Sequence, residues 1–371
     1  MKILIDASSI NKKNILASVP NYILRLIDAF LTNKTHDIAL LIDSDFQSFF
    51  GKKYPFTPKH LVKRNYFLYR LPIIGEIYAQ WCYRNATRQL NYDAEIIASD
   101  LDRGTKTKIK CKRIQIIHDL KAIKDGCFYQ KLKNKKFYQY ILLNSDSIVA
   151  ISEFTKQDII NYFKVDEKKI TVIPNSIVFA EAKENIKLGI PEKFILYVNT
   201  LSPHKNPITL IKAYETIQNQ INHKIIFVGK KTSYWEKIIL PYIQKHNLQN
   251  KIVHLQNLKF EELQYLYQKA SLFVTTSMRE GFGYTPIEAA LNMVPVISST
   301  SEALPYSTQG MLNYYFPADD YKNLAQKIID VLSTPPNKRQ LETIAKKFSI
   351  DYSPKVQIEK FNKLIQSMDV K

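Results

Sequence analysis

Short apolar runs rich in β-branched residues alternate along this chain with segments of helical period. Ile23, Leu26, Ile27 and Phe30 recur at i, i+3, i+4 and i+7, which predicts a helix over Tyr22–Leu31. The runs that predict strands in the first half are Ile3–Ile5, Ile38–Ile42, Glu95–Ala98, Ile114–Ile117, Ser147–Ile151 and Lys169–Ile173. Strands separated by helices are typical of a parallel, doubly wound α/β sheet.

The same rhythm restarts in the second half of the chain. Pro174 and Asn175 end the last strand of the first half, and residues 176–192 have no clear period, which predicts a linker. A last helix is expected near Pro354–Met368, after a break at 348–353. The strands predicted between linker and last helix are Phe194–Val198, Lys224–Val228, Ile252–Leu255, Leu272–Thr275 and Val296–Ser298.

These patterns predict two Rossmann-like domains in one α/β protein. The first covers residues 1–175, the second covers residues 190–350, and the C-terminal helix at 353–371 is expected to pack back on the first. Open parallel sheets bind ligands at the carboxyl ends of their strands. Two such sheets facing a central cleft would hold one ligand each, which favours an enzyme with two substrates.

Length and composition agree with two packed domains outside the secretory route. The chain has 371 residues, of which 45% are apolar, and no uninterrupted apolar run reaches the roughly 18 residues of a membrane span. The first strand begins at Lys2, so we expect no secretory signal. Cys82, Cys111 and Cys127 are widely spaced, as free thiols in a reducing cytosol would be. A cytoplasmic location is therefore expected.

The net charge of +19 is concentrated in the first half, where residues 1–175 hold 29 Lys/Arg against 17 Asp/Glu. Twelve basic residues and two acidic ones lie between Arg103 and Lys136, and Lys52–Arg70 mixes six cations with tyrosine and phenylalanine. Cations among aromatic rings favour an anionic membrane surface as partner and a peripheral position on the inner face of the membrane. A merely solvated basic surface is the alternative; nucleic acid is not expected as a partner.

The densest candidate chemistry lies in the segment Thr275–Ala290. A strand is followed by Glu280, then by Gly281, Phe282 and Gly283, and then by a helix expected to begin near Pro286 with Glu288 in its first turn. Glycines let backbone N–H groups approach a ligand, and a helix N-terminus attracts phosphate or oriented hydroxyls. A carboxylate accepts two hydrogen bonds, which suits the vicinal diol of a ribose or a sugar.

At this point the chain resembles glycosyltransferase family 4, whose retaining members have the GT-B fold of two Rossmann-like domains. The Glu-x7-Glu signature of that family matches Glu280 and Glu288. The stretch from Tyr197 to Asn206 resembles its strand-to-loop signature, which carries a basic residue followed by Lys-Asn. Further matches along most of the chain are Ile117-His118-Asp119, the segment from Ser152 to Ile160, and Ile170–Asn175.

The resemblance implies a role for each matching residue in a nucleotide-sugar donor site. Glu288 would hold the nucleotide ribose, while Glu280 and the backbone of Gly281–Gly283 would hold the donor sugar. Lys205 would lie on the diphosphate, where a fixed cation stabilises the charge that develops on the leaving group. The catalytic candidates are thus Glu280, Lys205 and His118, which ends a predicted strand.

Three further residues complete the expected donor-binding set. His204 and Thr200 stand where relatives often have arginine, and Leu258 follows a strand of the second domain near the expected base. The resemblance implies retention of anomeric configuration, with the leaving phosphate helping to remove the acceptor proton. The mannosyltransferase-like variant at 200–206 favours GDP-mannose as donor, with UDP-sugars as the alternative. A lipid-linked oligosaccharide of a surface polysaccharide pathway is the expected acceptor.

Competing interpretations rest on acidic pairs and on missing glycines. Asp43-Ser44-Asp45 and Asp100-Leu101-Asp102 could hold a divalent metal in another transferase fold, but we interpret both as loop carboxylates and expect neither metal nor cofactor. A dehydrogenase would need glycines after the first strand, yet none lies between Asp6 and Tyr22. Ser18–Tyr22 stands where the family's first loop has glycines, which keeps open a nucleotide-sugar-binding or scaffold protein without turnover.

Overall fold

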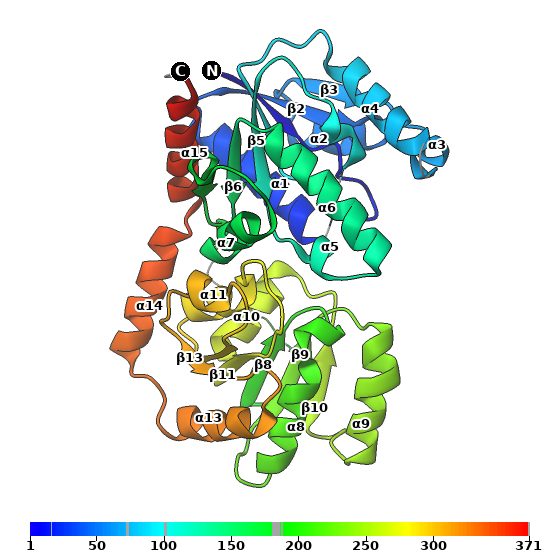
Figure 1. Cartoon of the computed structure of the whole chain (residues 1–371). Coiled ribbons are helices and arrows are strands. Elements are labelled where there is room, and N and C mark those ends of the chain that lie inside the picture. The colour runs from blue at the N-terminus through cyan, green and yellow to red at the C-terminus, as the bar shows by residue number, and fades with distance from the viewer. Residues whose placement is uncertain (16, 72–73, 100–101, 180–185, 187, 370–371) are drawn as a thin grey trace. The chain divides into compact units, whose positions relative to one another are not determined.

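The structure is a computed structural model that describes residues 1–15, 17–71, 74–99, 102–179, 186 and 188–369 (Figure 1). The chain divides into two compact units. The first unit is formed by residues 1–176 together with residues 354–371, and the second by residues 177–353. Among the described residues, no helix is both long and apolar enough to cross a bilayer.

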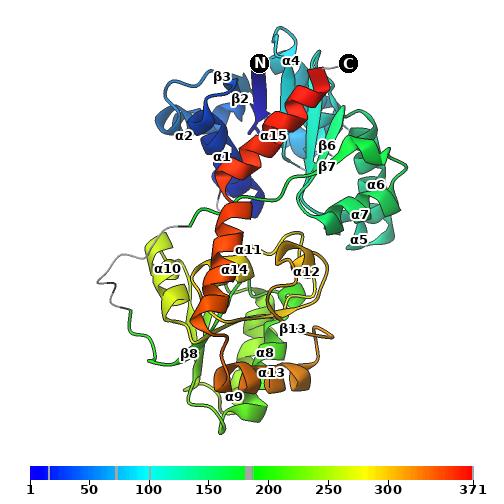
Figure 2. The same ribbon diagram turned by 90° about the vertical axis from the view of Figure 1, so that its left-hand side faces the viewer.

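The first unit is built on a parallel sheet of seven strands in the order β3-β2-β1-β4-β5-β6-β7. Its central strands are buried along almost their whole length because helices cover both faces (Figures 1 and 2). The strands are β1 (Lys2–Asp6), β2 (Asp37–Asp43), β3 (Lys59–Val62), β4 (Ala94–Ile97), β5 (Lys112–Ile117), β6 (Ser147–Ala150) and β7 (Ile170–Val172). The helices are α1 (Ser18–Asn33), α2 (Gln47–Lys53), α3 (Tyr66–Arg70), α4 (Ile74–Thr87), α5 (Lys121–Lys124), α6 (Phe128–Leu143), α7 (Glu153–Tyr162) and α15 (Pro354–Asp369).

The second unit contains a parallel sheet of six strands in the order β10-β9-β8-β11-β12-β13. A continuous apolar core around Tyr214, Phe227 and Trp235 joins this sheet to the helices on one of its faces. The strands are β8 (Phe194–Val198), β9 (Lys224–Val228), β10 (Ile252–Leu255), β11 (Leu272–Thr275), β12 (Val296–Ser299) and β13 (Asn313–Tyr315). The helices are α8 (Pro207–Ile217), α9 (Leu240–Lys245), α10 (Phe260–Lys269), α11 (Tyr284–Leu291), α12 (Leu304–Ser307), α13 (Tyr321–Ser333) and α14 (Lys338–Asp351).

Both sheets reverse their strand order beside the first strand of the unit. In the first unit β1 lies between β2 and β4, and in the second unit β8 lies between β9 and β11. The chain therefore leaves the two central strands in opposite directions at their carboxyl ends. Loops part there and leave room for a ligand, which makes these two points the expected sites of chemistry.

Helix α15 packs on α1 although some 320 residues separate them in sequence (Figure 2). The Phe361 ring lies 5.8 Å from the Phe30 ring, and Asn362 Oδ1 lies 3.0 Å from His36 Nε2. Gln357 is buried, accepts a hydrogen bond from Ser176 Oγ at 2.9 Å and donates one to the Pro174 carbonyl at 2.9 Å. The last helix thus completes the apolar side of the first unit.

Two strands escaped the sequence pattern. β3 has four residues in a basic stretch and β13 has three residues with an asparagine, too short and too polar to show a β period. The first helix begins earlier than expected: α1 starts at Ser18 and not at Tyr22, so the segment that stands where the family's first loop has glycines is helical here. Pro20 is tolerated because the first N–H groups of a helix have no intrahelical acceptor.

Replacing Phe361 with alanine should destabilise the first unit by about 3–5 kcal/mol, because the ring is fully buried against α1. The chain has two tryptophans, Trp81 in α4 and Trp235 in the second unit, so denaturation in a Trp235→Phe background reports on the first unit through Trp81 alone. The exposed Lys363→Ala on the same helix is the matched control and should change the midpoint little. Equal midpoints for both variants would contradict the packing of α15.

Candidate functional site

A salt bridge between Lys205 and Glu280 lies where the second sheet reverses its strand order. Lys205 ends the 3₁₀ turn that follows β8, and Glu280 lies in the loop that follows β11. Lys205 Nζ lies 2.5 Å from Glu280 Oε1, and each of the two side chains keeps only 12% of its surface exposed. Charge-assisted hydrogen bonds of this kind are strong when water is largely excluded.

The Glu280 carboxylate is held by neighbours from both central strands. Its Oε1 accepts hydrogen bonds from Ser277 Oγ at 2.9 Å and from Asn199 Nδ2 at 3.3 Å. Its backbone N–H donates to Glu302 Oε2 at 2.8 Å. Neither Asn199 nor Glu302 was expected from the sequence; the one signal for Asn199 is its position directly after β8. The result is a carboxylate whose position is set before any ligand arrives.

The backbone of Lys205 is equally well fixed. Its carbonyl accepts hydrogen bonds from Tyr197 Oη at 2.6 Å and from Thr276 Oγ1 at 3.1 Å. Tyr197 belongs to β8 and Thr276 directly follows β11, so both central strands of the sheet fix the position of the Lys205 backbone. An ammonium group anchored in this way loses little freedom when it meets an anion.

The loop between Glu280 and α11 depends on a glycine. Gly283 has φ of 94° and caps α11, and a Cβ there would lie 2.6 Å from Leu304 Cδ2. Gly281 is also buried in this turn. Phe282 points into the unit and packs on Tyr284 and Tyr352 with ring centroids 5.2 and 5.4 Å away, so only its backbone faces the loop.

Glu288 lies in the second turn of α11, because that helix begins at Tyr284 and not near Pro286. The expected first-turn position was therefore wrong. The glycine cap starts the helix two residues earlier, and Pro286 fits inside the first turn. Glu288 Oε2 accepts a hydrogen bond from Tyr267 Oη of α10 at 2.9 Å. The two glutamates of the signature are thus held by separate partners.

The remaining predicted donor residues lie on loops at the same edge of the second sheet. Thr200 is exposed, and its N–H donates to Asn199 Oδ1 at 2.9 Å. The His204 side chain is exposed. The His204 backbone carbonyl accepts a hydrogen bond from the Met278 N–H at 2.9 Å, which joins the loop after β8 to the loop after β11. Leu258 is partly buried beyond β10, two strands away from β8.

Gly229 marks a further close approach between two backbone segments of the second unit. It follows β9 with φ of 152°, and a Cβ there would lie 1.9 Å from the Asn199 carbonyl oxygen. Its own carbonyl oxygen lies 2.8 Å from His254 Nε2. The loop that carries Asn199 and the loop that carries Gly229 lie against each other, and because of this close approach only glycine fits at position 229.

His118 lies at the corresponding edge of the first unit, directly after β5. The ring is buried; its Nε2 lies 2.9 Å from the Ala98 carbonyl and therefore carries the proton. The Tyr22 ring meets it edge-on at 4.8 Å. Burial lowers the pKa of His118 to about 4, against the weaker opposing effects of the Ala98 carbonyl and Asp119. The imidazole is therefore neutral at pH 7.

Carboxylates interpreted as loop groups make local contacts. Asp43 Oδ1 accepts the Asp45 N–H at 2.9 Å, and Asp102 Oδ1 accepts the Gly104 N–H at 2.9 Å. Asp119 Oδ1 accepts the Lys121 N–H at 2.9 Å, as a cap partner would. Asp100 and Leu101 lie outside the described residues. The expectation that no metal binds stays a prediction.

A buried charged cluster at the strand ends of the first unit was not expected. Arg64 donates to Asp102 Oδ2 at 3.0 Å and to Ser8 Oγ at 2.9 Å, and lies 4.0 Å from Asp43 Oδ2. Asp6 ends β1; its Oδ1 accepts the Ser8 N–H at 2.8 Å, and its buried Oδ2 has no hydrogen-bond partner within the described part of the chain. Burial and the nearby Asp102 raise the pKa of Asp6 from 3.8 to about 6.

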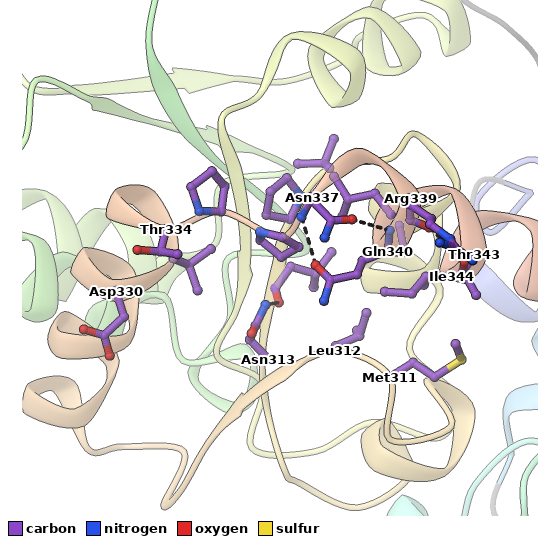
Figure 3. Close-up of a pocket in the computed structure, with 18 of the residues that line it drawn as sticks. Met311, Leu312, Asn313, Asp330, Thr334, Asn337, Arg339, Gln340, Thr343 and Ile344 are labelled. Carbon is purple, nitrogen blue, oxygen red and sulfur yellow. Dashed lines mark hydrogen bonds between the residues drawn. The ribbon is translucent and has the colours of Figure 1, made fainter.

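A groove of about 1170 Å³ lies elsewhere in the second unit, beneath α14 (Figure 3). Asn337 and Gln340 at the start of that helix exchange hydrogen bonds, and Met311 and Leu312 lie on the facing segment. Val296 and Asn313, at the amino ends of β12 and β13, also line it. The groove is therefore at the opposite edge of the sheet from Lys205 and Glu280.

Two family models match successive parts of the chain. The model described as "Glycosyltransferase Family 4" matches residues 21–180, and the one described as "Glycosyl transferases group 1" matches residues 179–348. The two parallel α/β domains thus have the GT-B fold. The chain belongs to glycosyltransferase family 4, as its Glu-x7-Glu motif indicated.

Relatives in sequence include two named bacterial mannosyltransferases. The O-antigen chain mannosyltransferase RfbU of Salmonella typhimurium is 28% identical over 240 residues, 63% of this chain and 65% of that protein. The serotype-specific mannosyltransferase WbdA of Escherichia coli is 26% identical over 277 residues, 69% of this chain. The match spans 34% of WbdA. The chain therefore covers slightly under two thirds of the length of RfbU and about one third of the length of WbdA.

Solved structures share the fold over nearly the whole chain at low sequence identity. HepE of Anabaena in complex with UDP has a TM-score of 0.76 at 16% identity, covering 99% of this chain and 100% of that one. A glycosyltransferase of Rickettsia africae has a TM-score of 0.75 at 18% identity, covering 99% and 98%. These similarities confirm the predicted fold class of two parallel α/β domains.

Replacing Asp6 with asparagine should stabilise the protein increasingly as the pH rises from about 4 to 6. The folded state binds the Asp6 proton more tightly than the unfolded state, so ionisation in that window costs stability, by about 3 kcal/mol in full. Asparagine keeps the acceptor for the Ser8 N–H. Denaturant unfolding of the unaltered protein and of Asp6→Asn across this pH range measures the difference between their free energies of unfolding. His118 and other titrating groups are present in both proteins, so their contributions cancel in that difference. A pH-independent difference would contradict the raised pKa.

Proposed function

We propose that this protein is a retaining glycosyltransferase that moves a hexose from a nucleotide-sugar to a lipid-linked glycan of a surface polysaccharide. The observation that carries the proposal is the Lys205–Glu280 pair beside the Gly281–Gly283 turn, at the reversal point of the second sheet. Family membership supports the reaction type, and the polysaccharide mannosyltransferases among the relatives support the pathway.

The pair supplies both kinds of group that a nucleotide-sugar needs. A diphosphate entering this edge would compete with Glu280 for the Lys205 ammonium and free the carboxylate for the sugar hydroxyls. The leaving group gains negative charge as the glycosidic bond breaks, and a fixed ammonium stabilises that state more than the bound substrate. Glu288, held by Tyr267, would accept the ribose hydroxyls.

GDP-mannose is the donor we propose first, because the relatives RfbU and WbdA are mannosyltransferases. UDP-sugars are the second candidate, since the structurally similar HepE was crystallised with UDP. No residue of the described site is proposed to hold a metal. His118, neutral at pH 7, would offer a hydrogen bond to the reacting sugar without adding a charge.

Nucleotide binding is tested by thermal and chemical denaturation with GDP, UDP, dTDP and ADP. One of them should stabilise the protein by about 2.7 kcal/mol at a hundredfold excess over its Kd. Lys205→Met and Glu288→Gln should each lose most of that effect. Lys346→Met, an exposed lysine on α14, is the matched control and should keep it. If no nucleotide stabilises the protein, the donor site is wrongly assigned.

Turnover separates an active transferase from a scaffold that only binds the nucleotide-sugar. Lys205→Met and Glu280→Gln should lower donor hydrolysis or transfer by about 10²–10³ in kcat, since each removes a group aimed at the developing charge or the donor sugar. Lys205→Arg keeps the cation and should recover part of the rate. Nucleotide binding without measurable turnover by the unaltered protein would favour the scaffold.

A further inference from the structure

A second pocket, of about 200 Å³, lies in the first unit between α4, the 3₁₀ helix Arg103–Lys106 and α6. Three cations and one carboxylate line it, so its walls carry two net positive charges. The lining residues are Glu76, Arg103, Lys106, Lys133, Asn134 and Phe137. It does not include His118, and Lys205, Glu280 and Glu288, which are proposed to hold the nucleotide-sugar, belong to the second unit.

Neighbouring groups hold two of the three cations in place. Arg103 Nη1 donates to the carbonyls of Tyr69 at 3.0 Å and Leu71 at 3.1 Å, which uses two of the five guanidinium donors. The Lys106 ammonium pairs with Glu76 and lies 5.2 Å from the Phe137 ring centroid. Lys133 is exposed, and no carboxylate pairs with it within the described stretches of the chain. The pocket therefore carries an excess of positive charge, and two of its three cations are held in place.

Exposed apolar side chains also lie on α4 and α6, the two helices that border this pocket. On α4, Ile74, Ile77 and Trp81 recur at i, i+3 and i+7, and each keeps between 58% and 67% of its surface exposed. On α6, Tyr129 and Leu132 are exposed at 73% and 44%. A continuous stripe of this kind on a water-facing helix is uncommon unless it meets an apolar partner. We call the pocket and these five side chains the α4–α6 surface.

The face of α6 that flanks the pocket combines rings and cations. Tyr129, Lys133, Lys136 and Tyr140 are spaced at i, i+4, i+7 and i+11, which places them on one side of the helix. The Tyr140 hydroxyl donates to the Lys106 carbonyl at 3.2 Å, so this side faces the 3₁₀ helix that forms one wall of the pocket. Tyrosine and tryptophan favour the boundary between headgroups and acyl chains, and lysine favours anionic headgroups.

We propose that the α4–α6 surface docks on an anionic lipid bilayer, with one lipid phosphate seated among Arg103, Lys106 and Lys133 and the α4 stripe entering the acyl region. Charge complementarity selects the anionic lipid, and the aliphatic stripe selects a bilayer over a nucleic acid. The inference rests on the proposed function only in so far as a lipid-linked acceptor lies at a membrane. Donor binding lies in the other unit, so either proposal can fail alone.

Sedimentation of the full chain with vesicles tests the surface. Binding should be strong to an equal mixture of phosphatidylcholine and phosphatidylglycerol and weak to phosphatidylcholine alone. Lys133→Glu should lower the partition coefficient at least about fivefold, the effect expected for one cation near an anionic surface. Lys168→Glu changes the net charge equally but lies before β7, away from the surface, and should have a much smaller effect.

The apolar part of the surface needs its own variant. Ile77→Ser should weaken binding to the mixed vesicles severalfold, whereas Ile238→Ser, a similarly exposed isoleucine of the second unit, should not. The nucleotide-induced stabilisation should be unchanged in all four variants, which distinguishes lost docking from lost donor binding. Equal binding to both vesicle types, equal effects of Lys133→Glu and Lys168→Glu, or tighter binding to single-stranded DNA than to vesicles would overturn the proposal.

Discussion

The salt bridge between Lys205 and Glu280 is the interaction on which the candidate site depends. Two partly buried opposite charges are stable there because each is held by the strands that meet at the reversal of the second sheet. Removing either group would leave a charge with little water around it, so the pair is a constraint as well as a contact. It keeps an ammonium and a carboxylate together at the edge where a doubly wound sheet accepts ligands.

Both sheets reverse their strand order in the same way, but different side chains gather at the two reversal points. At the reversal of the second sheet, glycines bring backbones close together and leave a cation and one carboxylate on loops and a second carboxylate on α11. At the reversal of the first sheet, Arg64 joins carboxylates from the ends of β2 and of the loop after β4, and all of these groups are buried. That cluster is closed to water, whereas Arg103, Lys106 and Lys133 line the pocket between α4 and α6.

Much of the candidate site was predictable because it follows strands that are obvious from their apolar runs. Glu280, Gly283 and Lys205 each come a few residues after such a strand, and parallel strands bring their ends to a common edge. Glu302 and Arg64 were missed because no motif marks them, and Asn199 because the signature stretch that contains it points to Lys205. Only contacts with other segments give the three residues a part. The start of α11 was misplaced because Pro286 is an equally good residue for a helix start, and the φ of Gly283 decided the boundary.

The sequence by itself determined the two α/β units, the family and the residues of the signature, because period, turn residues and motif spacing are local properties of a chain. Only the tertiary structure decided that Glu280 pairs with Lys205, that Tyr267 holds Glu288, and that α15 meets α1 through the Phe361 and Phe30 rings. It also decided which of many cations line one pocket and which apolar side chains stay exposed beside it. These are contacts between segments far apart in sequence, and the folding of the sheet alone brings them together.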